Sequence, residues 1–152
     1  MVWLKTTIIC GLFLALTLAL ALALAWPLPP SLRSEGNSVL NGRPIALLYA
    51  RTPSEQFQGL SDRERICDSC GMLFAFPDKQ PRTFVMRRMK FPLDIIWIND
   101  GRIVGMNLNL WPESAEPYTP YMSPEPVDSV LEMPAGSAEA YGLRLGMEAK
   151  LR

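Results

Sequence analysis

The most constraining feature of the chain is an apolar run close to its N-terminus. Residues 6–26, TTIICGLFLALTLALALALAW, carry no charged side chain, and the first charge after Lys5 is Arg33. A helix of this length spans roughly 31 Å at about 1.5 Å per residue, which matches the hydrocarbon core of a bilayer. Lys5 and the amino terminus precede the run, which favours leaving residues 1–5 in the cytoplasm. The sequence therefore predicts a single membrane span over residues 6–26.

Ala23-Leu24-Ala25 offers an alternative, because it resembles the small-residue site at which signal peptidase cleaves. The apolar core is longer than the usual signal-peptide core of about 7–15 residues, which favours a retained anchor. Both interpretations export the rest of the chain. We therefore expect a domain held on the extracytoplasmic side of the cell membrane, or a secreted domain if the chain is cleaved after Ala25.

The exported part divides into a linker and a domain. The segment PLPP at residues 27–30 ends the apolar helix, because proline lacks an N–H donor and disfavours helix in the residue before it. Residues 31–41 are rich in Ser, Gly and Asn and show no apolar period. We expect a flexible linker over residues 27–43 and a folded domain over residues 44–152, long enough to bury one core.

The composition excludes several classes of function. The chain contains no histidine, which is the usual base near neutral pH and the commonest metal ligand. Ser-His-Asp and Cys-His pairs and histidine-based zinc or iron sites are therefore excluded. Without Lys5, the chain has 14 basic and 15 acidic side chains. The domain therefore has no net positive charge that would attract nucleic acid. We expect no metal, no cofactor and no nucleic-acid partner.

Short strands and two short helices account for most of the domain. Residues 45–50 form an apolar run of strand length. TPSE at residues 52–55 combines a Thr cap, a proline at the first helical position and a Glu three residues after the cap, and Gly59 is placed to end that helix. A second helix is predicted over residues 134–141. Further strands are expected over residues 71–76, 83–86 and 127–133, with a Pro-rich surface flap over residues 111–126. The fold class is mainly β (α+β), a small barrel or sandwich with two short helices.

The clearest element is a predicted hairpin over residues 92–110. Asp100-Gly101 is a favoured two-residue turn, because both positions take positive φ. The turn places Trp97 opposite Val104 and Ile98 opposite Ile103. In this register, six side chains share a face that must be core: Leu93, Ile95, Trp97, Val104, Met106 and Leu108. The other face is mixed, and Gly105 leaves space beside Ile96 for another backbone or a ligand.

Five short motifs occur in an order and spacing found in a known family. They are QGLS at residues 58–61, GMLFAF at 71–76, FVM at 84–86, FPLDIIWI at 91–98 and VLEMPAG at 130–136. Together they resemble the domain-of-unknown-function 192 family over roughly residues 44–151. The resemblance implies a small, mostly β domain of a kind that bacteria and archaea often export. It implies no particular reaction.

Cys67 and Cys70, in the segment CDSCGMLF, allow three interpretations. Structural zinc takes four ligands, and one pair without histidine supplies only two. A thiol–disulfide exchanger places its leading cysteine at a helix N-terminus, whereas Gly71 and an apolar strand follow this pair. Asp68 also opposes a thiolate by charge. In an oxidising space we expect a disulfide that closes the turn before residues 71–76.

Two carboxylates, Asp94 and Glu132, interrupt otherwise apolar strands. A buried carboxyl group must find hydrogen bonds or a cation, or take up a proton. One hypothesis places Asp94, Asn107 and Glu132 in a polar pocket that binds a polyol or sugar, with Met86 and Arg87 beside them. The alternative gives both carboxyls structural roles, with Asp94 capping backbone N–H groups and Glu132 paired with an arginine.

These observations favour a membrane-tethered, extracytoplasmic binding or accessory module without enzymatic activity. Its partner beyond the membrane is an unidentified small molecule or envelope component. The rival hypothesis is a carboxylate-dependent hydrolase of envelope glycan, which needs Asp94 and Glu132 about 5 to 9.5 Å apart in one open cleft. A thiol–disulfide redox protein is the third hypothesis. The positions of the two carboxyl groups separate the first two.

Overall fold

Strand β1 (Gly36–Leu40) is the first element of the computed structural model, which describes residues 36–151. Asn41 and Gly42 both take positive φ and turn the chain into β2 (Arg43–Ala50), which pairs antiparallel with β1. Asn-Gly is a preferred two-residue hairpin turn for this reason. The linker predicted over residues 27–43 is therefore wrong at its C-terminal end, because residues 36–43 belong to the first hairpin of the domain.

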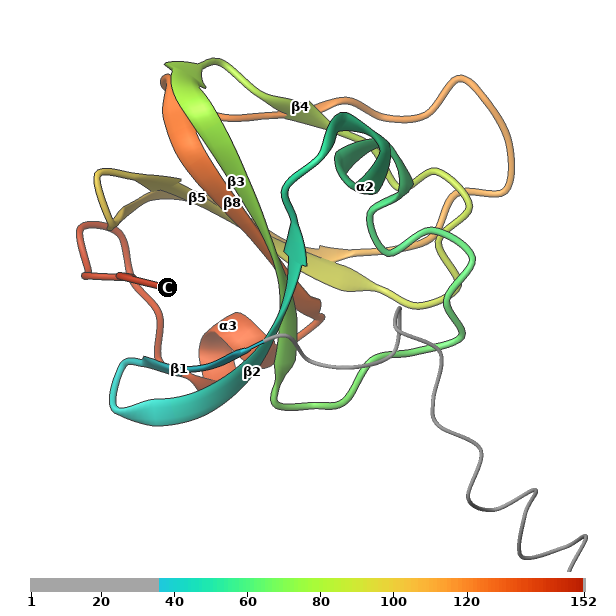
Figure 1. The fold of residues 1–152 in the computed structure, drawn as a ribbon. Helices are drawn as coiled ribbons and strands as arrows, with labels where there is room; N and C mark the ends of the chain where they lie inside the picture. Colours follow the sequence, from blue (N-terminus) through green and yellow to red (C-terminus); the bar gives the residue numbers. More distant parts are fainter. Residues whose placement is uncertain (1–35, 152) are drawn as a thin grey trace, which may run out of the picture. The chain divides into compact units, whose positions relative to one another are not determined.

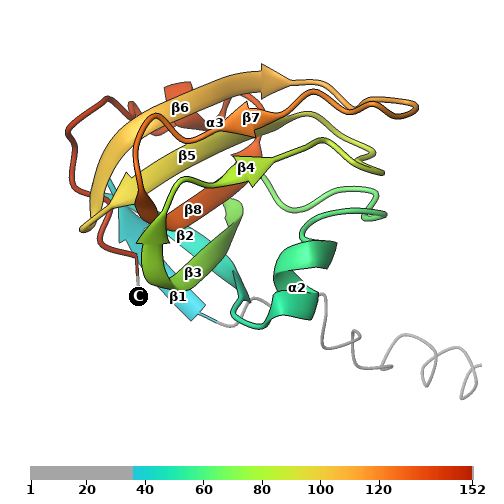
Figure 2. The same cartoon turned by 90° about the horizontal axis from the view of Figure 1, so that it is seen from above.

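Six strands form one sheet and two short strands form another (Figure 1, Figure 2). The large sheet also contains β3 (Cys70–Gln80), β5 (Leu93–Asn99), β6 (Arg102–Leu110) and β8 (Val127–Pro134), in the order β1-β2-β3-β8-β5-β6. Among the described strands, β2 and β3 are the one pair that runs parallel. The short strands are β4 (Thr83–Phe84) and β7 (Tyr121–Met122), so the predicted flap contributes one short strand.

The predicted barrel is wrong, whereas a mainly β fold with two short helices is confirmed. The edge strands β1 and β6 do not pair with each other, so the large sheet stays open. Its strands are twisted and the sheet is curved (Figure 1). A barrel would require hydrogen bonds between these two edge strands. Here other segments of the chain cover the two faces of the open sheet.

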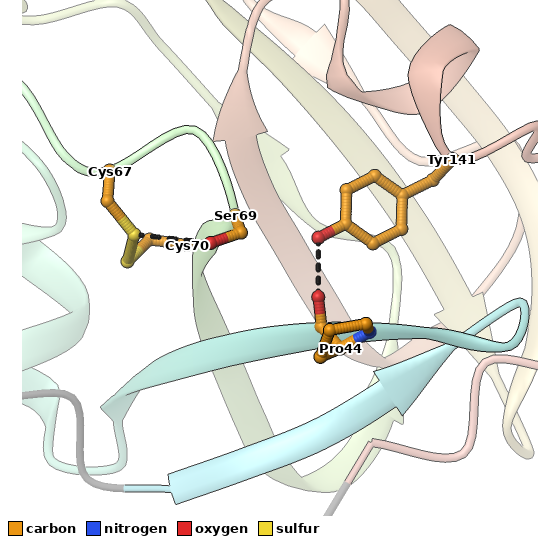
Figure 3. The surroundings of a disulfide bond; sticks show 5 residues. All are labelled: Pro44, Cys67, Ser69, Cys70 and Tyr141. Carbon is orange, nitrogen blue, oxygen red and sulfur yellow. Dashed lines mark hydrogen bonds between the residues drawn. A yellow bond between two sulfur atoms is a disulfide. The ribbon is translucent and has the colours of Figure 1, made fainter.

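Both predicted helices are present. Helix α2 (Pro53–Gln58) has a complete capping box, in which the Thr52 hydroxyl accepts from the Glu55 N–H and the Glu55 carboxylate accepts from the Thr52 N–H. Gly59 ends α2 with a φ of 51°. Helix α3 (Ser137–Ala140) follows β8, and the Tyr141 hydroxyl just after it donates to the Pro44 carbonyl at 2.7 Å (Figure 3).

The register of the predicted hairpin holds only beside its turn. Asn99 pairs with Arg102 and Ile98 with Ile103, but a bulge then shifts the ladder so that Trp97 pairs with Gly105. The face shared by Leu93, Ile95 and Trp97 is core as predicted, and Val104 packs against it. The placements of Met106 and Leu108 there are wrong, since Met106 packs on the other face and Leu108 is 42% exposed.

The large sheet is buried on both faces, one beneath the chain that follows α2 and the other beneath α3. These helices lie on opposite sides of β3 and β8 in Figure 1. One face packs with α3 and the C-terminal segment through Ile96, Ile98, Leu131 and Met133. The other packs with the segment after α2 and with the β4 region through Phe74, Ile95, Trp97 and Val130. The hairpin face that carries Ile96 and Ile98 was predicted to be mixed, and it is largely apolar.

A candidate ligand pocket around Glu132

A pocket of about 500 Å³ opens on the face of the sheet that packs with the β4 region. The end of α2 and the residues after it form one wall, and β4 with the segment after it forms another. Strands β3 and β8 contribute the floor through Phe74 and Glu132. About half of the lining is apolar or aromatic, which suits a small-molecule pocket, and this half includes Phe57, Leu60, Phe74, Phe76, Phe84 and Met89.

Glu132 lies in the middle of a cross-strand row of mostly apolar side chains. The register places it between Met72 on β3 and Ile95 on β5. Leu48 on β2 and Asn107 on β6 extend the row at either end. Residues directly opposite on neighbouring strands share a face. The carboxyl side chain is consequently buried, and its Oε2 has no hydrogen-bond partner among residues 36–151.

Burial in this setting raises the pKa of Glu132 from its ordinary value of 4.5 to about 8. The cause is desolvation, because the ionised form loses its hydration and gains no partner. At neutral pH the side chain is therefore mostly a neutral acid, which has one O–H to donate and oxygens that accept.

Gly59 keeps the approach to this carboxyl group open. A Cβ at that position would lie 3.8 Å from Glu132 Oε2 and 3.4 Å from Phe74 Cζ. The residue whose positive φ ends α2 is thus also one at which a side chain would take up space in the pocket. One glycine serves both the helix end and the space above Glu132.

Two arginines, Arg82 and Arg87, line the same pocket. The Arg87 guanidinium lies 3.8 Å from the centroid of the Phe57 ring, and its Nη2 donates to the Phe57 carbonyl. The Arg82 guanidinium lies 3.9 Å from the centroid of the Phe76 ring and pairs with Asp78 at 2.5 Å. These stacking contacts fix both side chains against aromatic faces.

Unpaired polar atoms concentrate in this pocket. Four buried side-chain polar atoms lack a hydrogen-bond partner among the described residues, and three of them belong to residues of this lining: Glu132 Oε2, Arg82 Nε and Arg87 Nε. Buried polar groups are normally paired, and leaving one unpaired costs about 1–3 kcal/mol. The pocket lining therefore combines apolar walls with three polar residues whose hydrogen-bonding capacity the described residues leave partly unused.

The comparisons identify the family of this domain. Residues 37–151 match the model of the DUF192 family, described as Uncharacterized ACR. The chain belongs to the DUF192 family. The resemblance carried by the five sequence motifs is thereby confirmed.

Two solved structures are similar to this DUF192 domain. One is a candidate transcription regulator from Sinorhizobium meliloti 1021, with 33% identity and a TM-score of 0.65 over 70% of this chain and 81% of that chain. The other is a protein of unknown function from Novosphingobium aromaticivorans DSM 12444, with 32% identity and a TM-score of 0.66 over 74% and 79%. Comparison with curated proteins gave no match. The solved neighbours support the fold.

The DUF192 domain brings only part of the predicted site together. Glu132 and Arg87 line the pocket, and Met86 is buried in the apolar cluster next to it. Asp94 lies elsewhere, with Oδ1 accepting from the Asn109 N–H and Oδ2 from the Ala138 N–H, each at 2.9 Å. These contacts match the structural alternative for Asp94, which caps backbone N–H groups.

Asn107 and Glu132 also depart from their predicted environments. Asn107 Oδ1 accepts from Trp97 Nε1 at 2.7 Å, and Asn107 is not part of the pocket lining. Neighbouring residues on a strand point to opposite faces, so Asp94 points away from the face that carries Ile95 and Glu132. Glu132 forms no ion pair with an arginine within residues 36–151. The structure thus separates the two carboxyl groups.

Cys67 and Cys70 form a disulfide at the start of β3 (Figure 3). The Cys70 N–H donates to the Cys67 carbonyl and the Ala46 N–H donates to the Ser69 carbonyl, both at 2.9 Å. The closed turn is therefore tied to β2. A strand follows the pair, so the helix dipole that activates exchanger cysteines is missing here.

The described part of the chain contains no cluster of metal-binding side chains and no helix that could span a membrane. No group of three or more His, Cys, Asp or Glu side chains there is placed to hold a metal ion. No helix within residues 36–151 is long and apolar enough to cross a bilayer. The predicted span over residues 6–26 lies outside the described residues.

Several pocket residues carry only weak signals in the sequence. Arg82 and Arg87 form a basic cluster with Arg88 and Lys90 in the sequence, and nothing in their spacing separates a pocket arginine from a solvated one. Phe57 is an apolar side chain on a short helix and is 70% exposed in the structure. Gly59 signals a helix end, but its position beside Glu132 depends on long-range packing. Glu132, a carboxylate within an apolar strand, was the one strong signal.

Proposed function

We propose that this DUF192 protein is a non-enzymatic binding module that holds a small polar molecule in the Glu132 pocket. The observation that carries the proposal is a pocket lined by Glu132, Arg82 and Arg87, each of which keeps a polar atom without a partner among the described residues. Aromatic and apolar walls supply contact area, and the few polar groups supply orientation. A volume of about 500 Å³ suits a molecule of one or two sugar rings.

The proposal places this module on the extracytoplasmic side of the membrane, tethered by residues 6–26. The uncharged run supports a membrane span, and a disulfide suits an oxidising compartment. The partner is then a small molecule of the cell envelope. A fusion of alkaline phosphatase after Arg152 tests this placement, since that enzyme is active only after export. An inactive fusion of full-length protein would contradict it.

A hydrolase that uses two carboxylates has less support. Glycoside hydrolysis by this route needs both carboxyl groups in one cleft. Asp94 instead accepts two backbone N–H groups and points to the other face of the sheet from Glu132. A binding role needs only the groups that the pocket contains.

Blocking the pocket tests the proposed function. Val85 lines the pocket and is 40% exposed, so Val85→Trp should fill its mouth without disturbing the core. Val39 on β1 is 62% exposed and lies outside the lining, so Val39→Trp is the matched control. Envelope sugars, sugar acids and amino acids are screened against the full-length chain by ligand-observed NMR. The screen uses a polyoxyethylene detergent, which contains no sugar.

The expected result is a set of ligands that bind wild type and Val39→Trp but not Val85→Trp. Ligands that bind Val85→Trp as well as wild type would place the site elsewhere and overturn the proposal. A screen without any ligand for the wild type would also count against it.

A further inference from the structure

We propose that the pocket takes a small organic anion, a hydroxylated carboxylate, whose negative group binds Arg87 and whose hydroxyl meets Glu132. This inference rests on the proposed function and names the ligand class. It follows from the charges around the pocket, from the geometry of Arg87 and from the setting of Glu132.

The charges around the pocket leave Arg87 without an acidic partner. Arg82 is neutralised by Asp78 at 2.5 Å. Arg87 has no carboxylate within ion-pair distance among residues 36–151. The acidic side chains on and after α2 are engaged elsewhere: Glu55 with the N-cap of α2, Asp62 with Arg88, and Glu64 with Lys90. The lining therefore has one cation that no residue in the described range 36–151 compensates, and an anion is its natural complement.

The geometry of Arg87 suits a carboxylate. Its guanidinium is held by the Phe57 ring, and Nη2 is occupied by the Phe57 carbonyl. Nε is buried and without a partner among the described residues. Nη1 has no hydrogen-bond partner among the described residues and is not one of the buried unpaired atoms, so it is the N–H group of this fixed guanidinium that a ligand carboxylate can reach.

Glu132 completes the site as a neutral acid. The charged side chains that share the pocket with it are Arg82 and Arg87. Its cross-strand neighbours Met72 and Ile95 carry no charge, and neither do the α2 residues of the lining, Gln56, Phe57 and Gln58. A protonated carboxyl donates to a hydroxyl or carbonyl oxygen and does not repel an anion at Arg87.

This arrangement links binding to protonation. The pKa of Glu132 is raised by burial to about 8, and ionisation would place a second negative charge in a pocket that already holds the ligand's carboxylate. An anionic ligand therefore binds the protonated form best, and its affinity falls as pH rises above about 8. A cationic ligand would show the opposite trend, because it prefers ionised Glu132.

Three related sugars that differ in charge test the ligand class. The probes are sodium D-glucuronate, D-glucose and D-glucosamine at equal millimolar concentration, with sodium chloride added to match ionic strength. Binding is measured as the ligand-induced rise in the melting temperature of the full-length chain, in a polyoxyethylene detergent, at about pH 6 and about pH 9.

Glucuronate is expected to stabilise the protein most at pH 6, glucose less, and glucosamine not at all. At pH 9 the glucuronate affinity should be about tenfold weaker, since roughly one molecule in ten keeps Glu132 protonated one unit above its pKa. Glu132→Gln, which mimics the neutral acid, should bind glucuronate at both pH values. Arg87→Gln should lose the preference for glucuronate over glucose, and the exposed control Arg144→Gln should keep it.

Each other outcome overturns the inference. A preference for glucosamine at about pH 6, where its amine is charged, would show that the pocket favours a cation, and glucuronate binding that strengthens towards pH 9 would contradict the link to Glu132 protonation. Equal binding of glucose and glucuronate would leave the proposed function intact but would show that the pocket does not prefer an anion. If none of the three sugars binds, the inference also fails. The comparison of Val85→Trp with Val39→Trp then decides the proposed function separately.

Discussion

The buried acid at position 132 should make the stability of this protein fall as pH rises towards 8. The pKa of Glu132 is about 8 in the folded domain and has its ordinary value of 4.5 in the unfolded chain. The folded state thus binds the proton more tightly, and unfolding releases it at any pH between these values. The free energy of unfolding then decreases by about 1.4 kcal/mol per pH unit in this window.

The magnitude is large compared with the stability of a small domain. Between pH 5.5 and pH 7.5 the expected loss is about 2–3 kcal/mol, against a typical total of about 5–15 kcal/mol. The window is free of the usual interference, because the chain has no histidine and no other side-chain type ordinarily titrates there. The stabilisation from the protonated carboxyl is fully present below about pH 4.5 and is gone above about pH 8.

Urea unfolding of the full-length chain, followed by tryptophan fluorescence, measures this effect. Trp97 is 1% exposed and should report the loss of packing. Glu132→Gln removes the titrating group, so its free energy of unfolding should be flat from pH 5.5 to pH 7.5 and should exceed that of wild type at pH 7.5. Glu139→Gln, on the exposed side of α3, should keep the wild-type slope. A flat wild-type profile, or a Glu132→Gln profile that still slopes, would refute the reasoning.

Three further substitutions test how the fold is held, each read from the midpoint of urea unfolding. Asp94→Ala leaves two backbone N–H groups without an acceptor and should cost about 2–4 kcal/mol; an unchanged midpoint would contradict its capping role. Replacing Cys67 and Cys70 with serine should cost about 2 kcal/mol, because so short a loop gains little from closure, and should leave glucuronate binding unchanged. Gly71→Ala places a Cβ 2.7 Å from Leu131 Cδ1 and 3.1 Å from a backbone oxygen, and a loss of about 1–3 kcal/mol is expected; a neutral result would show that the sheet relaxes there.

Local chemistry explains which parts of the fold were predictable. The capping box at Thr52 and Glu55 and the turn at Asp100-Gly101 each depend on a few neighbouring residues, and the structure has both. The disulfide is of the same kind, since three residues of sequence separation bring the two sulfurs within reach. These predictions held because each depends on contacts within a single turn, which tertiary packing changes little.

The hairpin shows where local reasoning stops. Its turn sets the register only as far as Ile98, because the bulge between Trp97 and Ile98 moves the next pairs by one residue and a second shift before Ile95 moves Leu93 by two. The space predicted beside Gly105 is filled by the flap, where a Cβ on that glycine would lie 2.8 Å from Pro124 Cγ. Neither the bulge nor the position of the flap follows from the alternation of apolar residues.

The pocket could be anticipated at only one residue. Glu132 was a carboxylate in an apolar strand, and such a group has to be explained by any fold. Arg87 and Phe57, which line the pocket with Glu132, come from segments far from it in the sequence, and they meet only after α2 and the β4 region pack over the same sheet face. Asp94 gave the same sequence signal as Glu132, but its carboxylate accepts from backbone N–H groups on the other face of the sheet. The two side chains point to opposite faces because Glu132 pairs with Ile95, the residue after Asp94.

The measurement that tests the account most directly is the pKa of the Glu132 carboxyl group itself. It can be followed by ¹³C NMR of the full-length chain, with the signal assigned from Glu132→Gln, in the absence and presence of saturating sodium glucuronate. We expect a pKa near 8 in the free protein and a higher value with the sugar acid bound. A carboxyl that titrates near 4.5, or a pKa that the ligand leaves unchanged, would contradict it.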